Sequence, residues 1–167
     1  MMNRPNISIP FTKTDSRLEL VIWLLSAAIL VSVIYHYAVL PERVPIHFSF
    51  NGQPDGWSGK ESVWLLAGIY FFVATTLFFM NKHPQQFNYS VPITEENAAQ
   101  MYQVGAWMVR LIRVWGAIIF LGIQWMVYDS AMNGGASKIN YILMVCVVGL
   151  LCTVGWGIYR FHIKAPK

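Results

Sequence analysis

Residues 18–40 read LELVIWLLSAAILVSVIYHYAVL, and this stretch decides what kind of protein the chain can be. It carries one acidic residue, Glu19, with no lysine, arginine or proline. A helix needs about 20 apolar residues to cross the hydrocarbon core of a bilayer. The stretch is too long for the apolar part of a secretion signal, and no small-residue cleavage site follows it. We therefore expect a retained membrane-spanning helix.

Three more stretches of this kind follow, at about residues 62–80, 106–128 and 139–159. Of the 167 residues, 56% are hydrophobic and 12% are charged, which is about half the charged fraction of a soluble domain. We predict an all-α integral membrane protein in which residues 1–167 form a single domain with four transmembrane helices. An even number of crossings leaves both termini on the same side of the bilayer.

The distribution of lysine and arginine predicts which side that is, because cytoplasmic loops carry an excess of both. Nine basic residues lie on the side of the termini: Arg4, Lys13, Arg17, Lys82, Arg110, Arg113, Arg160, Lys164 and Lys167. Three lie on the other side: Arg43, Lys60 and Lys138. We expect a multi-pass protein of the bacterial plasma (inner) membrane with both termini in the cytoplasm. The basic residues are spread out, so nucleic acid is not an expected partner.

The segment between the first two spans, residues 41–61, has the pattern of an ordered extended cap on the outer face. Apolar residues recur at every second position, as in a half-buried strand: Val44, Ile46, Phe48 and Phe50. Residues 51–52 (Asn-Gly) predict one turn, and residues 54–56 (Pro-Asp-Gly) predict a second. We expect Phe48, Phe50 and Trp57 to pack onto the helix ends.

The same loop holds the candidate ligand-binding residues: His47, Asn51, Asp55, Trp57 and Lys60. An imidazole, an amide, a carboxylate and an ammonium that converge can bind a polar ligand or a cation, or move protons. The plainer interpretation is that His47 and Asp55 satisfy only each other and the turn backbone. No tight metal-ligand spacing occurs, so we expect no metal and no cofactor.

Two arginines, Arg110 and Arg113, stand one turn inside the third predicted span, on one helix face. They can extend toward inner-leaflet phosphates. Alternatively they form an internal charge pair or contact a ligand, and Glu95 and Glu96 are the acids nearest in sequence. The loop before them, residues 82–92, is polar with two prolines. We expect it to be irregular, with a helix starting at Thr94 and running into the span.

The fourth predicted span carries small residues at every fourth position: Gly149, Thr153 and Gly157. Such a row lets another helix approach closely. The neighbour can be a helix of the same bundle or of a second copy, so a homo-oligomer through this row is one expectation.

Several segments resemble a known family, a bacterial membrane domain of unknown function. The resemblance rests on Leu40-Pro41, Val44-Pro45-Ile46-His47-Phe48, Asn51-Gly52-Gln53-Pro54-Asp55-Gly56-Trp57 and Lys60. It extends to Lys82-His83-Pro84, Asn88-Tyr89 and Ile93-Thr94-Glu95-Glu96-Asn97-Ala98, and so covers roughly residues 18–128. The domain also forms the N-terminal part of Sdp-type immunity and signalling proteins, which protect cells from a secreted killing peptide. Those proteins carry a further multi-helix region where this chain has its fourth span.

The function expected from these features is binding or sensing of an envelope peptide or small ligand at the outer loop, and the resemblance implies an immunity-like role. The lipid bilayer is the other expected partner. A subunit of an oligomeric transporter or channel is the alternative. A membrane enzyme using His47 and Asp55 is a second alternative, but the sequence holds no recognisable nucleophile–base set. We therefore expect a protein that is not an enzyme.

Overall fold

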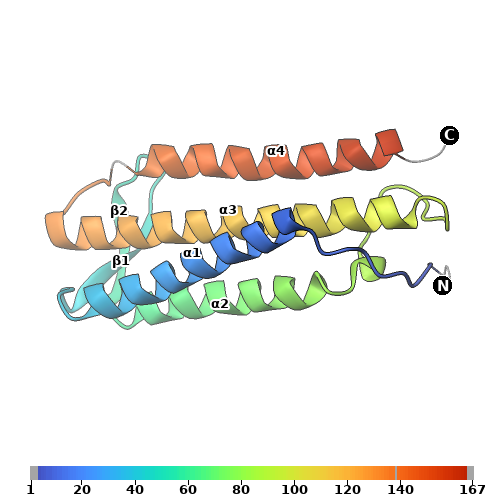
Figure 1. The fold of residues 1–167 in the computed structure, drawn as a ribbon. Helices are drawn as coiled ribbons and strands as arrows, with labels where there is room; N and C mark the ends of the chain where they lie inside the picture. The colour runs from blue at the N-terminus through green and yellow to red at the C-terminus, as the bar shows by residue number, and fades with distance from the viewer. Residues whose placement is uncertain (1–3, 138, 165–167) are drawn as a thin grey trace.

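Four long helices and one β-hairpin make up the fold in a computed structural model that describes residues 4–137 and 139–164 (Figure 1). The helices are α1 (Lys13–Tyr37), α2 (Ser62–Met80), α3 (Ala98–Asn133) and α4 (Asn140–Lys164). The hairpin consists of β1 (Arg43–Phe48) and β2 (Pro54–Gly59), and a short 3-10 helix, η1, spans Pro84–Gln86. Two residues of the charge count, Lys138 and Lys167, lie outside the described residues.

The helices lie alongside one another, and the bundle has two distinct ends (Figure 1). The hairpin end carries β1, β2 and the α3–α4 connection. The terminal end carries the described ends of the chain and the segment 81–97 between α2 and α3. All four helices are long and apolar enough to cross a membrane, which confirms the predicted all-α membrane fold.

The central element is α3, which packs against α1, α2 and α4. The inward face of α1 follows helical spacing: Ile22, Ser26, Ile29 and Val33 are buried, while many residues between them are exposed. Hydrophobic side chains exposed all round a bundle are expected where the surroundings are lipid. A buried hydrogen bond also joins two of the helices, since the hydroxyls of Ser26 in α1 and Tyr70 in α2 lie 2.6 Å apart.

The small-residue row of α4 packs on α3 of the same chain. A side chain on Gly149 would meet the Trp115 ring, with a first carbon only 2.6 Å away, and one on Gly157 would meet Met108. The Trp115 indole also donates a hydrogen bond of 3.0 Å to the Thr153 hydroxyl. The row is therefore occupied within the bundle, which is one of the two predicted neighbours, and a homo-oligomer through it stays a prediction.

Two predicted helix starts shift. The first helix begins at Lys13, five residues before the predicted span, because Thr12 and Asp15 form a capping box. In this box the Thr12 side chain accepts a hydrogen bond from Asp15 N, and the Asp15 carboxylate accepts one from Thr12 N. The third begins at Ala98 rather than Thr94. There the Asn97 side chain accepts a hydrogen bond from Thr94 N and donates one to the Pro92 carbonyl, which holds a turn before the helix.

Candidate functional site

The hairpin is anchored to the bundle on its inner side. Val44 of β1 is fully buried in a cluster with residues of α1, α2 and α3: Val33, Val63, Ala67, Val127 and Tyr128. Leu40, just before the hairpin, belongs to the same cluster. The backbone N–H of Lys60 donates to the Glu42 carbonyl and closes the base of the hairpin. The hairpin is thus an ordered cap on the helix ends.

The strand pairing explains which side chains the hairpin exposes. β1 and β2 are antiparallel, and the register is irregular between Pro45 and Phe48. Such a bulge adds a residue to one strand and changes which face a side chain occupies. Pro45 is buried with Val44, whereas Ile46 is exposed, so the predicted alternation fails after Val44. The predicted second turn, residues 54–56, is also wrong, because these residues pair with β1 as the start of β2.

One acid–base pair stands on the outer side of the hairpin. The His47 Nδ1 atom lies in direct contact with an oxygen of Asp55, while 72% of the His47 side chain and 48% of the Asp55 side chain stay exposed. Gly56 faces His47 across the strands, and a side chain there would have its first carbon 2.9 Å from His47 Cβ. Only glycine gives the two strands this close approach, which brings the imidazole and the carboxylate together.

The other predicted site residues have separate partners. The Asn51 side-chain oxygen accepts from the Ser49 hydroxyl and from Gln53 N, so it holds the predicted Asn51-Gly52 turn. The Lys60 ammonium donates to the Glu42 carboxylate at 2.9 Å, and this hydrogen bond raises the pKa of Lys60 above its ordinary value. The five residues therefore share one hairpin, but only His47 and Asp55 form a pair.

The aromatic residues of the hairpin differ in their packing. Phe48 packs against the anchoring cluster as predicted. Phe50 at the turn is 90% exposed and Trp57 is 42% exposed, so the expected packing of Phe50 onto helix ends is wrong. Phe50 lies in the loop of residues 49–53 between the two strands, and this loop extends away from the helix ends.

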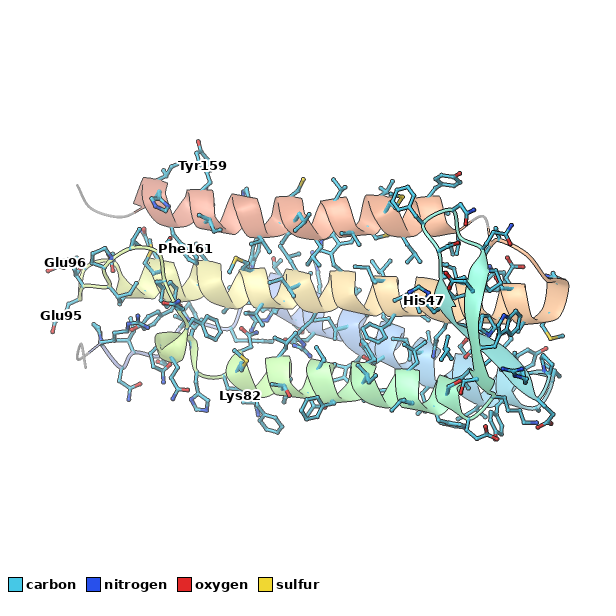
Figure 2. The ribbon with its side chains drawn as sticks, turned by 180° about the vertical axis from the view of Figure 1, so that it is seen from behind. His47, Lys82, Glu95, Glu96, Tyr159 and Phe161 are labelled. Carbon is cyan, nitrogen blue, oxygen red and sulfur yellow. The ribbon has the colours of Figure 1, made fainter. Side chains whose placement is uncertain are left out.

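A second cluster of charges lies buried near the terminal end, and it involves the two predicted arginines. Arg110 Nε and Arg113 Nη1 donate to Glu19 of α1 at 3.1 and 2.9 Å. Arg110 Nη1 also lies 3.0 Å from Asp15, which is buried. The arginines thus form an internal charge cluster with α1 and do not extend to lipid phosphates. Their partners are not Glu95 and Glu96, which are exposed at the tip of the terminal end (Figure 2).

Asp15 and Glu19 were not predicted as these partners. The available signal was their spacing: two carboxylates four apart and two arginines three apart each occupy one helix face, near the same membrane boundary. Uncompensated charges inside a membrane are costly, so such faces tend to meet.

The two ends thus carry different chemistry (Figure 2), with His47 on the hairpin and Lys82, Glu95 and Glu96 at the terminal end. In the part of the chain that the structure describes, no group of three or more histidine, cysteine or acidic side chains could hold a metal ion. The hairpin therefore offers one exposed hydrogen-bonding pair beside exposed aromatic surface.

Residues 23–71 match a domain of unknown function, DUF1648. The match covers most of α1, the whole hairpin and the first half of α2, and so contains His47 and Asp55. It confirms a domain of unknown function in the segment that carries the outer motif. The chain is also similar to a protein of Archaeoglobus fulgidus described as uncharacterized: 27% identical over 128 residues, covering 67% of this chain and 69% of that protein. No solved structure matches the chain.

Proposed function

We propose that this membrane protein recognises a ligand outside the cytoplasm through its β-hairpin and acts as a sensor or immunity-like protein. The observation that carries the proposal is the exposed His47–Asp55 pair on a hairpin that is itself firmly anchored. Function concentrates in exposed residues held by a rigid scaffold. A site ordered before binding also loses less conformational entropy when the ligand arrives.

The exposed side chains favour an amphipathic ligand. Phe50, Trp57 and Ile46 offer apolar contact area, and His47 and Asp55 offer a hydrogen-bond donor and acceptor beside it. Exposed aromatic residues are typical centres of binding energy in interfaces. A peptide with alternating apolar and polar side chains suits such a surface. The resemblance to Sdp-type immunity proteins, which act against a secreted peptide, supports the same ligand class.

The anchoring of the hairpin supports a sensing role. Leu40 and Val44 belong to one buried cluster with residues of α1, α2 and α3. Closely packed interiors transmit small displacements instead of absorbing them. A ligand that shifts the hairpin would therefore shift the ends of three helices together, and that movement would reach the opposite side of the membrane.

The proposal includes an orientation with both termini in the cytoplasm of the plasma membrane, which in a bacterium is the inner membrane. Arg110 and Arg113 are neutralised by Asp15 and Glu19, so they carry less weight as topology signals. Without these two arginines the basic residues still divide seven to three in favour of the terminal end facing inward.

A subunit of an oligomeric transporter is the second candidate, because one observation favours it. Gln124, in the last third of α3, is 1% exposed, and within the described residues neither polar atom of its side chain has a hydrogen-bond partner. Buried polar groups inside a membrane often mark a transport path. The sensor proposal predicts that Gln124→Leu leaves the ligand response unchanged, whereas a transport path would lose activity.

We further propose that the protein binds its ligand without chemical conversion. The His47–Asp55 pair is the feature that a membrane enzyme would use. Among the described residues, no hydroxyl or thiol is hydrogen-bonded to the pair, and a nucleophile within such reach is the usual arrangement.

The melting temperature of the purified full chain tests the proposal. Zn²⁺ and a synthetic cationic amphipathic peptide would each be added to wild type, His47→Ala, Asp55→Ala and the control Glu42→Gln. A ligand in hundredfold excess over its dissociation constant stabilises the folded state by about 2.7 kcal/mol. We expect the peptide to raise the melting temperature of wild type and Glu42→Gln but of neither pair variant. A peptide shift of equal size in all four proteins would contradict the proposal.

A further inference from the structure

A groove at the terminal end, away from the hairpin, has the features of a lipid-binding site. It encloses about 590 Å³ between the start of α1, the start of α3 and the end of α4. Its apolar part is formed by Val104, Trp107 and Trp156, and its polar part by Thr12, Gln100, Gln103 and Arg160. Tryptophan in membrane helices is enriched at headgroup level, where an apolar ring meets a polar boundary.

Arg160 brings a positive charge to this groove. Its guanidinium lies 5.6 Å from the centre of the Trp156 ring, one helical turn away, so the stacked ring fixes the position of the charge. The Nε atom is buried and has no hydrogen-bond partner within the described residues. A buried donor of this kind costs free energy unless an acceptor satisfies it.

Within the described residues, the groove holds no acceptor of opposite charge. None of the described residues that line the groove is acidic. Arg110 and Arg113 differ in this respect, because Asp15 and Glu19 neutralise both of them. Arg160 is therefore a partly buried arginine of the terminal end that has no acidic partner among the described groove residues, so a phosphate group from outside the chain can pair with it.

We propose that this groove binds an anionic glycerophospholipid. The phosphate accepts hydrogen bonds from the Arg160 guanidinium, whose planar fork matches phosphate oxygens. The polar headgroup lies among Thr12, Gln100 and Gln103, and an acyl chain runs along Trp107 and Trp156. Basic pockets between transmembrane helices are suited to anionic headgroups, and the two indole rings, 6.4 Å apart, form an apolar wall for the chain.

The test is native mass spectrometry of the full chain with phosphatidylglycerol and phosphatidylcholine supplied in equal amounts. We expect wild type to retain phosphatidylglycerol preferentially. In Arg160→Gln the preference should fall about tenfold, the fold-change typical of losing one charge-assisted hydrogen bond. Arg17→Gln is the matched control: it removes the same charge from the same end, at an exposed position outside the groove, and should keep the preference.

A second variant separates lipid binding from folding. Gln103→Trp fills the groove without changing the net charge, so it should lose the retained lipid even where Arg160→Gln folds poorly. An unchanged preference in either Arg160→Gln or Gln103→Trp would overturn the proposal. An equal loss in Arg17→Gln would also overturn it, because the lipid would then be held by the general positive charge of this end.

Discussion

The two ends of the bundle each bring carboxylates to basic side chains, but in opposite surroundings. At the terminal end, Asp15 and Glu19 meet Arg110 and Arg113 in the interior. At the hairpin end, Asp55 meets His47 with both side chains largely open to solvent. Breaking a buried ion pair leaves an uncompensated charge in the interior, which destabilises the fold, whereas an exposed group that loses its partner is solvated by water.

This difference assigns the two ends different roles. The buried cluster joins α1 to α3 through three hydrogen bonds that Glu19 accepts from Arg110 and Arg113. The exposed pair contributes little to the fold, and its outer surface is free for a ligand. The same contrast distinguishes Arg160 from the paired arginines, and it underlies the proposed lipid site.

The largest expected effect follows from Glu19→Gln. Without this carboxylate Arg113 loses its charge partner, and Arg110 keeps only Asp15. We expect the free energy of unfolding to fall by about 3–5 kcal/mol. Denaturant titration in detergent micelles measures this loss. The control is Glu42→Gln, which removes the exposed carboxylate that pairs with Lys60. Equal free energies of unfolding for the two variants would show that the charge cluster at the terminal end does not stabilise the fold.

The anchoring of the hairpin predicts the next effect. Leu40→Ala removes a buried side chain from the cluster beneath the hairpin and should cost about 2–4 kcal/mol. It should also expose Arg43 and Lys60 to trypsin. Val39→Ala, at an exposed neighbouring position, is the matched control. If both variants resist trypsin as wild type does, Leu40 does not hold the hairpin.

Gly56→Ala should disturb the His47–Asp55 pair by pushing the two strands apart. Its methyl group would lie 2.9 Å from His47 Cβ, so the strands must separate at a cost of about 1–3 kcal/mol. Gly59→Ala is the control, since a methyl there meets only the flexible end of the Glu61 side chain. The NMR signals of the His47 imidazole should shift in Gly56→Ala and not in Gly59→Ala. Identical spectra of the two variants would show that the close approach of the strands at Gly56 is not needed to form the His47–Asp55 pair.

Asp55→Asn should have a smaller effect on stability, under about 1 kcal/mol, because the pair is exposed. The same denaturant titration measures this loss. A loss as large as that of Glu19→Gln would make the hairpin pair structural and would abolish the contrast between the two ends.

The smallest effect concerns the ammonium of Lys60. The Glu42 hydrogen bond raises its pKa, so Glu42→Gln should bring the pKa down toward the ordinary value of 10.5. NMR titration of isotope-labelled dimethyl-lysine follows this change. A pKa that stays raised would show that Glu42 is not its cause.

The sequence was sufficient for the fold because lipid imposes a simple rule: long apolar stretches become helices. The boundaries were harder to predict, since Thr12 and Asp15 start α1 through a local capping box that lies outside the apolar stretch. The pairing of Glu19 with Arg110 and Arg113, 91 and 94 positions apart, depends on how α1 and α3 are rotated about their axes. Hydropathy does not encode that rotation.

The candidate site was predictable in part for a similar reason. Asn51-Gly52 makes its turn from local preference alone. The Pro-Asp-Gly segment at residues 54–56 has the same local preference, but pairing with β1 overrides it and makes a strand. The bulge near His47 then exposes Ile46, and no alternation pattern predicts a bulge.

The measurement that tests the central claim most directly is cysteine labelling in intact cells, since the hairpin can recognise an outside ligand only if it faces outward. With Cys146 and Cys152 replaced by serine, a single cysteine would be introduced at Phe50 or at Glu95, both exposed and at opposite ends. A membrane-impermeant maleimide should label Phe50→Cys in intact cells and Glu95→Cys only after the membrane is opened. Labelling of Glu95→Cys in intact cells, with Phe50→Cys protected, would contradict the account.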